Sequence, residues 1–175
     1  KVEYQGADLS DPQAIEAMMA ELEAQGGIDI LVNNAGIQHV APIEDFAPER
    51  WQAVIAINLS SVFYTMHGAL AGMKRRGWGR VVNIASAHGL VASAQKSAYV
   101  AAKHGVVGLT KVAALETAQT GITVNAICPG WVLTPLVQKQ IDARAAAAGI
   151  PAEEAQRDLL GEKQPSLAFV TPEQI

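Results

Sequence analysis

Short apolar runs alternate along the chain with longer segments whose apolar residues recur at helical spacing. The runs at residues 28–32, 80–85 and 122–127 have the length and near-continuous hydrophobicity of strands buried on both faces of a sheet. The helical segments between and after them are residues 48–73, 97–119, 135–148 and 151–160. This alternation predicts βαβ units, and hence an α/β fold with a doubly wound parallel sheet and helices on both faces.

Local signals mark where individual elements start and stop. Ser10-Asp11-Pro12 combines an oxygen-bearing cap with a proline in the first turn, and Gly26-Gly27 ends the helix that follows. The chain begins within what resembles a short strand, residues 2–5, and it ends at Thr171-Pro172-Glu173, which resembles a helix start. We therefore expect one partial domain over residues 1–175 that is truncated at both ends.

Ligands of doubly wound sheets bind at the carboxyl ends of the strands, which selects three loops for attention. These loops are Asn33-Asn34-Ala35-Gly36, Ser86-Ala87-His88-Gly89 and Pro129-Gly130-Trp131-Val132. All three follow an apolar run and carry small or polar residues. We expect the functional groups of the chain to gather there.

Composition narrows the class of protein. Half of the residues are hydrophobic, 17% are charged and the net charge is −4, which gives no basis for nucleic-acid binding. The densest basic cluster, residues 74–76, is typical of a helix end. The single cysteine, Cys128, allows no disulfide within the chain and fits a reducing cytoplasm. We see no signal peptide and no uncharged apolar stretch long enough to span a membrane, and we predict no metal site.

Tyr99 and Lys103 are the first candidates for chemistry. Four residues apart on a helix means the same face, and a nearby cation lowers the pKa of a phenol. A tyrosine so placed can act as a general acid or base. The spacing alone is weak evidence, because many surface helices contain it. Ser86 at a strand end adds context, while Asn58, which interrupts an apolar helix, is either functional or a local kink.

Together these residues resemble a known family. Asn33-Asn34-Ala35-Gly36, Asn58, Ser86, Tyr99-Val100-Ala101-Ala102-Lys103 and Pro129-Gly130 match the short-chain dehydrogenases/reductases in order and spacing over essentially the whole chain. The resemblance implies a Rossmann-type fold and hydride transfer to or from a nicotinamide coenzyme. It makes Tyr99 the proton-exchanging group, with its pKa lowered by Lys103. It also implies that Ser86 binds the substrate oxygen and that Asn58 anchors a water relay.

The resemblance also implies a set of coenzyme contacts. Lys103 and Tyr99 would hold the nicotinamide ribose, and the remaining contacts would be Asp8, Leu9, Asn34, Ala35, Gly36, Pro129, Gly130, Val132 and Thr134. The glycine-rich phosphate-binding turn of the family is absent from the chain, and so is the strand whose end selects NAD or NADP. We therefore expect these 175 residues alone to bind coenzyme poorly and to be inactive.

A narrower resemblance points to family members that interconvert D-3-hydroxybutyrate and acetoacetate with NAD. It lies in residues 37–40, 86–93, 96–99, 128–132 and 162–166. It implies that the substrate carboxylate is held by Gln38, His88, Lys96 and Gln140, which supply donors and a positive charge. Taken singly, each of these residues has an ordinary structural explanation. Trp131 either walls the substrate pocket or packs the segment around it, and residues 133–160 would form a helical lid over the substrate.

Two other functions compete with this interpretation. One is another reductase of the family, such as a 3-oxoacyl-carrier-protein reductase, and the other is a non-catalytic dinucleotide-binding protein. Gln38, His88 and Lys96 favour a small free acid over a carrier-bound substrate, and a pure binding protein would not need Tyr99 and its partners. The resemblance further implies a homotetramer, assembled through the helices at residues 48–73 and 97–119.

Overall fold

The computed structural model describes residues 2–161 and 164–175. By its internal contacts the chain divides into two compact units, Lys1–Cys128 and Pro129–Ile175. The division falls just after the last strand of the sheet, so the segment predicted as a lid belongs to the second unit.

The first unit is built on a parallel three-stranded sheet in the order β1-β2-β3. Its strands are β1 (Ile30–Asn33), β2 (Gly79–Ile84) and β3 (Ile122–Ile127), and its helices are α1 (Pro12–Ala24), α2 (Pro48–Ile55), α3 (Ser61–Arg76) and α4 (Ser97–Thr117). Short helical turns lie at η1 (Ile43–Asp45), η2 (Ala56–Ser60) and η3 (Ala87–Gly89). The alternation of strand and helix predicted from hydrophobic spacing is confirmed, with small shifts at the boundaries.

The expected strand at residues 2–5 is not formed. Val2 and Tyr4 are 97% and 90% exposed, and residues 2–7 pair with no strand of the described sheet. A strand needs a neighbour that satisfies its backbone groups, and apolar β-forming residues without such a partner do not hold an extended pairing. Asp11 caps α1 as expected, because its carboxylate accepts from the backbone N–H of Gln13 at 2.9 Å.

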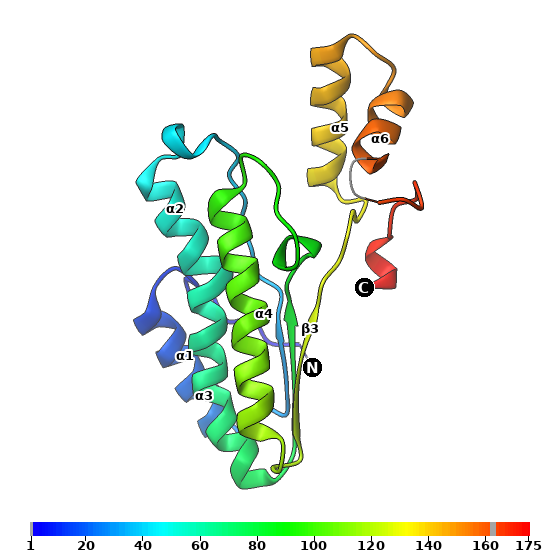
Figure 1. Cartoon of the computed structure of the whole chain (residues 1–175). Coiled ribbons are helices and arrows are strands. Elements are labelled where there is room, and N and C mark those ends of the chain that lie inside the picture. Colours follow the sequence, from blue (N-terminus) through cyan, green and yellow to red (C-terminus); the bar gives the residue numbers. More distant parts are fainter. Residues whose placement is uncertain (1, 162–163) are drawn as a thin grey trace. The chain divides into compact units, whose positions relative to one another are not determined.

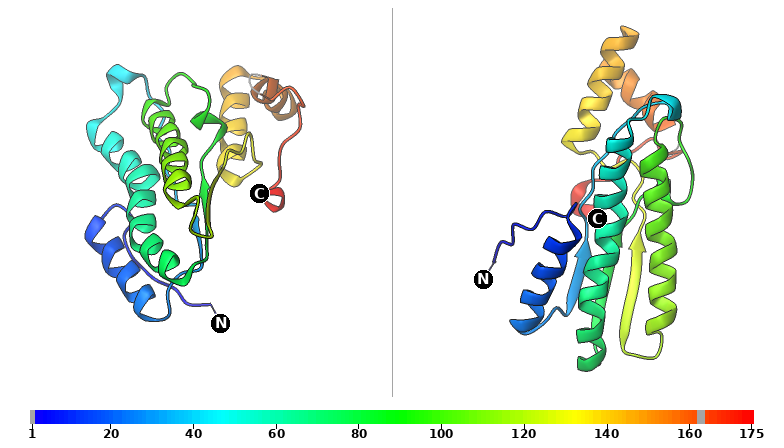
Figure 2. Two further views of the ribbon diagram at one scale, coloured as in Figure 1. Left: turned by 60° about the horizontal axis from the view of Figure 1, so that its bottom comes forward. Right: turned by 90° about the vertical axis from the view of Figure 1, so that its left-hand side faces the viewer.

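Within the described part of the first unit, the helices lie on one face of the sheet (Figure 1). Viewed from that side, β1 lies behind the gap between α1 and α3, and β3 behind the gap between α3 and α4 (Figure 2). Strand residues alternate accordingly: Val81 and Val124 are buried toward the helices, whereas Ile30 and Val32 are 61% and 56% exposed on the other face. The apolar strand runs thus present two faces, and the helices of the first unit cover one of them.

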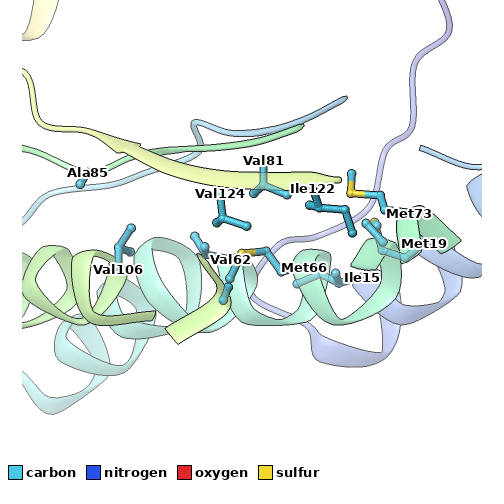
Figure 3. Close-up of a cluster of buried hydrophobic side chains, with 12 residues drawn as sticks. Ile15, Met19, Val62, Met66, Met73, Val81, Ala85, Val106, Ile122 and Val124 are labelled. Carbon is cyan, nitrogen blue, oxygen red and sulfur yellow. The ribbon is translucent and has the colours of Figure 1, made fainter. Parts of the chain in front are cut away.

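The core of the first unit fills the space between the sheet and α1, α3 and α4. Met66 and Met73 of α3 reach toward Val81, Ile122 and Val124 of the strands (Figure 3). Ile15 and Met19 join them from α1, and they are the buried residues of that helix. At about 25 cal/mol for each Å² of apolar surface removed from water, this cluster is the main stabilising contribution to the unit.

The interruption predicted at Asn58 is a π-helical turn, residues Ala56–Ser60, between α2 and α3. The backbone N–H of Ser61 donates to the Ala56 carbonyl, and the Ser61 hydroxyl donates to the Ile57 carbonyl oxygen at 2.6 Å. The rod from Pro48 to Arg76 reaches the length and mean hydropathy of a membrane span, contrary to what the sequence suggested. Its buried residues, such as Met66 and Met73, lie in the core described above, which is typical of a core helix.

A buried polar chain connects strand β1 and the helices α3 and α4 to Asn83 in the middle of β2. The Asn83 side chain is fully buried, accepts from Asn33 Nδ2 at 2.9 Å and donates to Thr110 Oγ1 at 2.9 Å. Thr65 donates in turn to Asn33 Oδ1 at 2.8 Å. Because every group in this chain has a partner, its burial costs little, and it locks α3 and α4 to the strand ends that carry the site.

The second unit consists of α5 (Pro135–Ala148), α6 (Ala152–Gly161) and the segment that follows them. Val137 and Ile141 of α5 pack against Ala155 and Leu159 of α6, and Gly149 in a left-handed conformation separates the two helices. A single parallel bridge joins Val132 to Val170, and a short helical turn, Pro172–Gln174, ends the unit. Both helices predicted for this region are confirmed.

Candidate active site

Ser86 follows β2 directly and begins the turn that forms the first wall of the site. Its hydroxyl oxygen accepts from the backbone N–H of His88 at 3.1 Å, which caps η3. Gly89 then brings this turn against α4, because a Cβ at residue 89 would lie only 2.8 Å from the Lys103 carbonyl oxygen. Glycine at this position therefore sets how closely Ser86 approaches α4.

Tyr99 lies in the first turn of α4, and its ring is half-buried. Burial raises the pKa of Tyr99 above the ordinary value, while a hydrogen bond from Ser86 acts in the opposite direction. The sequence predicted a pKa lowered by Lys103, and for the chain by itself this expectation is wrong. Removing the phenol from water penalises the phenolate more than its polar neighbours favour it.

Lys103 is almost fully buried, at 4% exposed, with its ammonium 5.7 Å from the centre of the Tyr99 ring. The ammonium donates to the Ile84 carbonyl oxygen at 2.6 Å, and burial lowers the pKa of Lys103 to about 8. An ammonium has three N–H donors, and Ile84 is the one hydrogen-bond acceptor for them in the described part of the chain. The other two donors suit hydroxyl groups such as those of a ribose.

Asn58 lies in the π-helical turn and holds the loop after β1. Its Oδ1 accepts from the Ile37 N–H and its Nδ2 donates to the Ile37 carbonyl, both at 2.8 Å. The fully buried Asn58 amide therefore spends these hydrogen bonds on the backbone of Ile37, next to Gln38. The side chain acts on loop position, so a water relay at Asn58 would have to use its main chain.

The structure brings together the loops that carry three of the four predicted carboxylate ligands. Gln38 follows the residue clamped by Asn58, and the N–H of Ala41 in the same loop bonds to the Gln95 carbonyl at 3.0 Å. Lys96 comes next, immediately before α4. His88 lies edge-on to Tyr99, with ring centres 6.0 Å apart, and its Nε2 is 2.7 Å from Ser93 Oγ.

Some of the predicted coenzyme contacts also converge. Leu9, Asn34 and Ala35 line a cavity of about 270 Å³ beside β1, together with residues of α1 and α3. Asp8 precedes Leu9, and its carboxylate accepts from both the backbone and the hydroxyl of Ser10, which lowers its pKa. The residues present thus suit the nucleoside ends of a dinucleotide, whereas no glycine-rich turn for its pyrophosphate lies within the chain.

The remaining predicted contacts belong to the second unit. Thr134 caps α5, with its hydroxyl oxygen accepting from the Val137 N–H at 3.3 Å, and Gln140 is half-buried on the same helix. Trp131 packs against the cluster formed by α5 and α6, and Val132 pairs with Val170. Pro129 and Gly130 begin the unit, and Glu162 and Lys163 of the segment 162–166 lie outside the described residues.

Comparison with known proteins identifies the class. The family model of the short-chain dehydrogenases matches residues 1–145, so the chain belongs to this family. Solved structures agree: actinorhodin polyketide ketoreductase with NADPH matches at a TM-score of 0.85 and 39% identity, over 96% of this chain and 65% of that one. Levodione reductase matches at 0.80 and 37%, over 94% and 63%. The predicted family and Rossmann-type fold are confirmed, and a nicotinamide dinucleotide is the coenzyme class.

Two curated relatives carry one name. D-beta-hydroxybutyrate dehydrogenase of Cupriavidus necator is 68% identical over 176 residues, which cover 100% of this chain and 68% of the relative. The enzyme of that name from Rhizobium meliloti is 57% identical over 97% of this chain and 66% of its own length. The chain therefore spans about two thirds of these relatives, and the narrower resemblance predicted from the sequence is confirmed.

Several groups that shape the site were not identified from the sequence. Asn83 was treated as part of an apolar strand, and no role was given to Ser93 or to the Ile84 carbonyl. A polar residue inside an otherwise apolar buried run is a signal for Asn83, because such a group must find partners. Ser93 and the carbonyl carry no comparable signal, since their roles depend on how loops and helices meet in space.

Proposed function

We propose that the whole protein containing this chain interconverts D-3-hydroxybutyrate and acetoacetate with NAD as the coenzyme. The observation that carries the proposal is the meeting of Ser86, Tyr99 and Lys103 at the carboxyl end of β2, beside the loops of Gln38 and Lys96. The proposal is supported by the 68% and 57% identity to two D-beta-hydroxybutyrate dehydrogenases.

Proton exchange is assigned to Tyr99. In the oxidative direction the phenolate takes the hydroxyl proton of the substrate, and in reduction the phenol returns it to the carbonyl oxygen. Ser86 donates a hydrogen bond to the same oxygen. Lys103, with its pKa near 8, is mostly protonated at neutral pH and places a positive charge 5.7 Å from the centre of the Tyr99 ring.

The coenzyme supplies one piece of chemistry, acceptance of the hydride from the carbinol carbon or its return. Lys103 and Tyr99 would hold the nicotinamide ribose, since two donors of the buried ammonium suit its hydroxyls. The other contacts proposed for the coenzyme are Asp8, Leu9, Asn34, Ala35, Gly36, Pro129, Gly130, Val132 and Thr134. The preference for NAD over NADP is proposed only from the resemblance of this chain to the family members that oxidise D-3-hydroxybutyrate.

The carboxylate of the substrate is assigned to Gln38, His88, Lys96 and Gln140. Lys96 contributes the charge and the amides contribute directional donors, which together distinguish a free acid from a neutral ester. His88 can bind the carboxylate through Nε2 only by giving up its 2.7 Å contact with Ser93. Residues 133–160 are proposed as a lid that excludes water when it closes, with Trp131 at its base.

Assembly and location complete the proposal. We propose a homotetramer formed through α2–α3 and α4, in the cytoplasm, with no membrane or nucleic-acid partner. Phe63 on α3 and Leu115 on α4 are 48% and 79% exposed, and apolar residues so exposed on long helices suit a subunit interface.

The test is nicotinamide absorbance at 340 nm with the intact protein. D- and L-3-hydroxybutyrate are each offered with NAD and with NADP. We expect reduction of NAD with the D acid alone. The neutral methyl ester of the D acid serves as the matched substrate, and it should show a KM raised at least tenfold because it lacks the charge that Lys96 recognises.

Two outcomes would contradict the assignment. If neither acid is oxidised although NAD binding is demonstrated, the substrate assignment is wrong. Turnover of acetoacetyl thioesters without turnover of acetoacetate would favour a reductase that acts on carrier-bound substrates. Equal KM for acid and ester would leave the reaction in place and remove the carboxylate site.

A further inference from the structure

Gln95 has a backbone conformation that residues with a side chain rarely adopt. Its φ is 63°, in the left-handed region that glycine occupies without strain, and it lies in the turn directly before Lys96 and α4. The Gln95 side chain is exposed, so its packing does not explain the conformation. A strained backbone persists only where the surrounding structure holds it. The conformation is therefore attributable to what the Gln95 backbone binds.

The Gln95 carbonyl binds the loop that follows β1. It accepts a hydrogen bond from the backbone N–H of Ala41 at 3.0 Å. The carbonyl belongs to the planar peptide unit that joins Gln95 to Lys96, so the bond also fixes the backbone from which the Lys96 side chain starts. A negative φ at Gln95 would rotate this peptide unit relative to the preceding residues and turn the carbonyl away from Ala41. The left-handed conformation and the bond to Ala41 thus belong together.

The loop after β1 is thereby held at two points. The Asn58 amide holds Ile37 through both of its backbone groups, each at 2.8 Å, and the Gln95 carbonyl holds Ala41. Gln38 lies in the short stretch between these two points. Its backbone therefore has little freedom left, and the second point ties it to the residue that precedes the lysine at the start of α4.

We propose that Gln95 is a positioning residue whose left-handed backbone sets the spacing between Gln38 and Lys96, and thereby the preference of the site for a free carboxylate. The inference rests on the proposed function, which assigns these two side chains to the substrate carboxylate. An amide and an ammonium recognise one carboxylate only if both reach it at hydrogen-bond distance, so the spacing of their backbones matters. The proposed proton chemistry lies outside this effect, because Ser86 and Lys103 are held by bonds of their own.

Gln95→Val tests the conformation itself. A valine, branched at Cβ, hardly ever adopts a positive φ, so the variant should lose the bond to Ala41. The preference is measured with the intact protein and NAD, as kcat/KM for D-3-hydroxybutyrate divided by kcat/KM for its methyl ester. We expect this ratio to fall about tenfold, the effect of misplacing one hydrogen bond to a charged group, while kcat for the ester stays within about twofold of the wild type.

Two further variants separate the conformation of Gln95 from its side chain. Gln95→Gly removes the side chain but adopts a positive φ without strain, so it should keep the preference within about twofold. Ala94→Val places the same branched side chain on the neighbouring exposed residue, whose φ is not positive, and should also keep the preference. A loss in Gln95→Gly as large as that in Gln95→Val would overturn the proposal, as would an unchanged preference in Gln95→Val.

A second readout does not depend on activity. Hydrogen exchange of the Ala41 amide in the intact protein should be about fivefold faster in Gln95→Val than in the wild type, the effect of one lost hydrogen bond, and unchanged in Gln95→Gly. The Ile37 amide, which donates to Asn58 Oδ1, is the internal reference. Equal exchange of the Ala41 amide in all variants would refute the hold on the loop. If neither the acid nor the ester is oxidised, the proposed function falls and the role in specificity falls with it, while the exchange rates still decide whether Gln95 holds the loop.

Discussion

The two units of the chain hold their functional residues in different ways. In the first unit, Ser86, Tyr99 and Lys103 sit on strand and helix ends that are tied together by buried polar bonds centred on Asn83. In the second unit, Trp131 packs against a small apolar cluster between α5 and α6, Gln140 lies half-buried on α5, and one bridge joins Val132 to Val170. The proposed proton chemistry thus falls on a frame joined by buried polar bonds, and the proposed lid on a helical pair with a smaller apolar cluster, as expected of a segment that opens and closes.

Tyr99→Phe should give the largest effect, because it removes the group that we propose exchanges the proton and leaves the frame intact. We expect kcat for the D acid to fall by about a thousandfold or more, within the range of general acid–base catalysis. The free energy of unfolding should change by less than about 1 kcal/mol, since the ring and its packing are retained. Absorbance assays and urea titration measure the two quantities.

Tyr64→Phe is the matched control for this change. Tyr64 is a half-buried tyrosine on α3, where the loss of a hydroxyl should leave kcat unaltered. Retention of a tenth or more of the wild-type kcat in Tyr99→Phe would transfer the proton step to another group and would favour a protein that only binds the dinucleotide.

Asn83→Ala tests the frame itself. The substitution removes the acceptor of Asn33 and the donor to Thr110, so that buried polar groups on two other elements lose a partner. We expect the free energy of unfolding to fall by about 3 kcal/mol, the sum of such penalties and a small cavity. Urea-induced unfolding followed by tryptophan fluorescence measures the loss.

Asn125→Ala is the control for Asn83→Ala. Asn125 lies on the neighbouring strand β3, but its side chain is exposed on the uncovered face, so its loss should change stability by less than about 0.5 kcal/mol. Equal losses for the two variants would mean that the buried polar chain contributes nothing beyond strand propensity.

How much of this could be predicted from sequence depends on how local the signal is. The helix from Pro135 to Ala148 and the strand from Ile122 to Ile127 were predicted with the bounds observed, because spacing, proline and glycine are signals read within one segment. The prediction of a strand at residues 2–5 was wrong, because the pairing of a strand depends on a neighbour elsewhere in the fold. The family resemblance predicted the site residues Asn58, Ser86, Tyr99 and Lys103. The raised pKa of Tyr99 follows from burial, which no local pattern reports.

The buried ammonium of Lys103 should make the stability of the first unit depend on pH. Because burial lowers its pKa to about 8 from 10.5, the unfolded chain binds the proton more tightly than the folded one. Stability should therefore rise as the pH increases from 8 to 10.5, and the cost of the buried charge is fully present below pH 8. By linkage the gain is about 3 kcal/mol.

The comparison is the wild type against Lys103→Met in denaturant titrations at several pH values, which cancels the contribution of other titrating groups. The difference between the two proteins should change by about 3 kcal/mol in favour of the wild type across this window. A difference independent of pH would show that the ammonium is as well stabilised in the fold as in water.

Gln164→Ala should have the smallest effect, and it probes the lightly supported unit. Gln164 Oε1 accepts from the Trp131 N–H at 2.9 Å and its Nε2 donates to the Ala168 carbonyl, so one side chain joins both ends of the unit. Its loss should lower hydrogen-exchange protection of the Trp131 amide about fivefold, the effect of one hydrogen bond of about 1 kcal/mol. The Ile141 amide within α5 is the internal reference. Gln138→Ala, which removes an exposed bond to Asp142, is the control. Unchanged protection at Trp131 would mean that packing against α5 and α6, and not this amide, holds the predicted base of the lid.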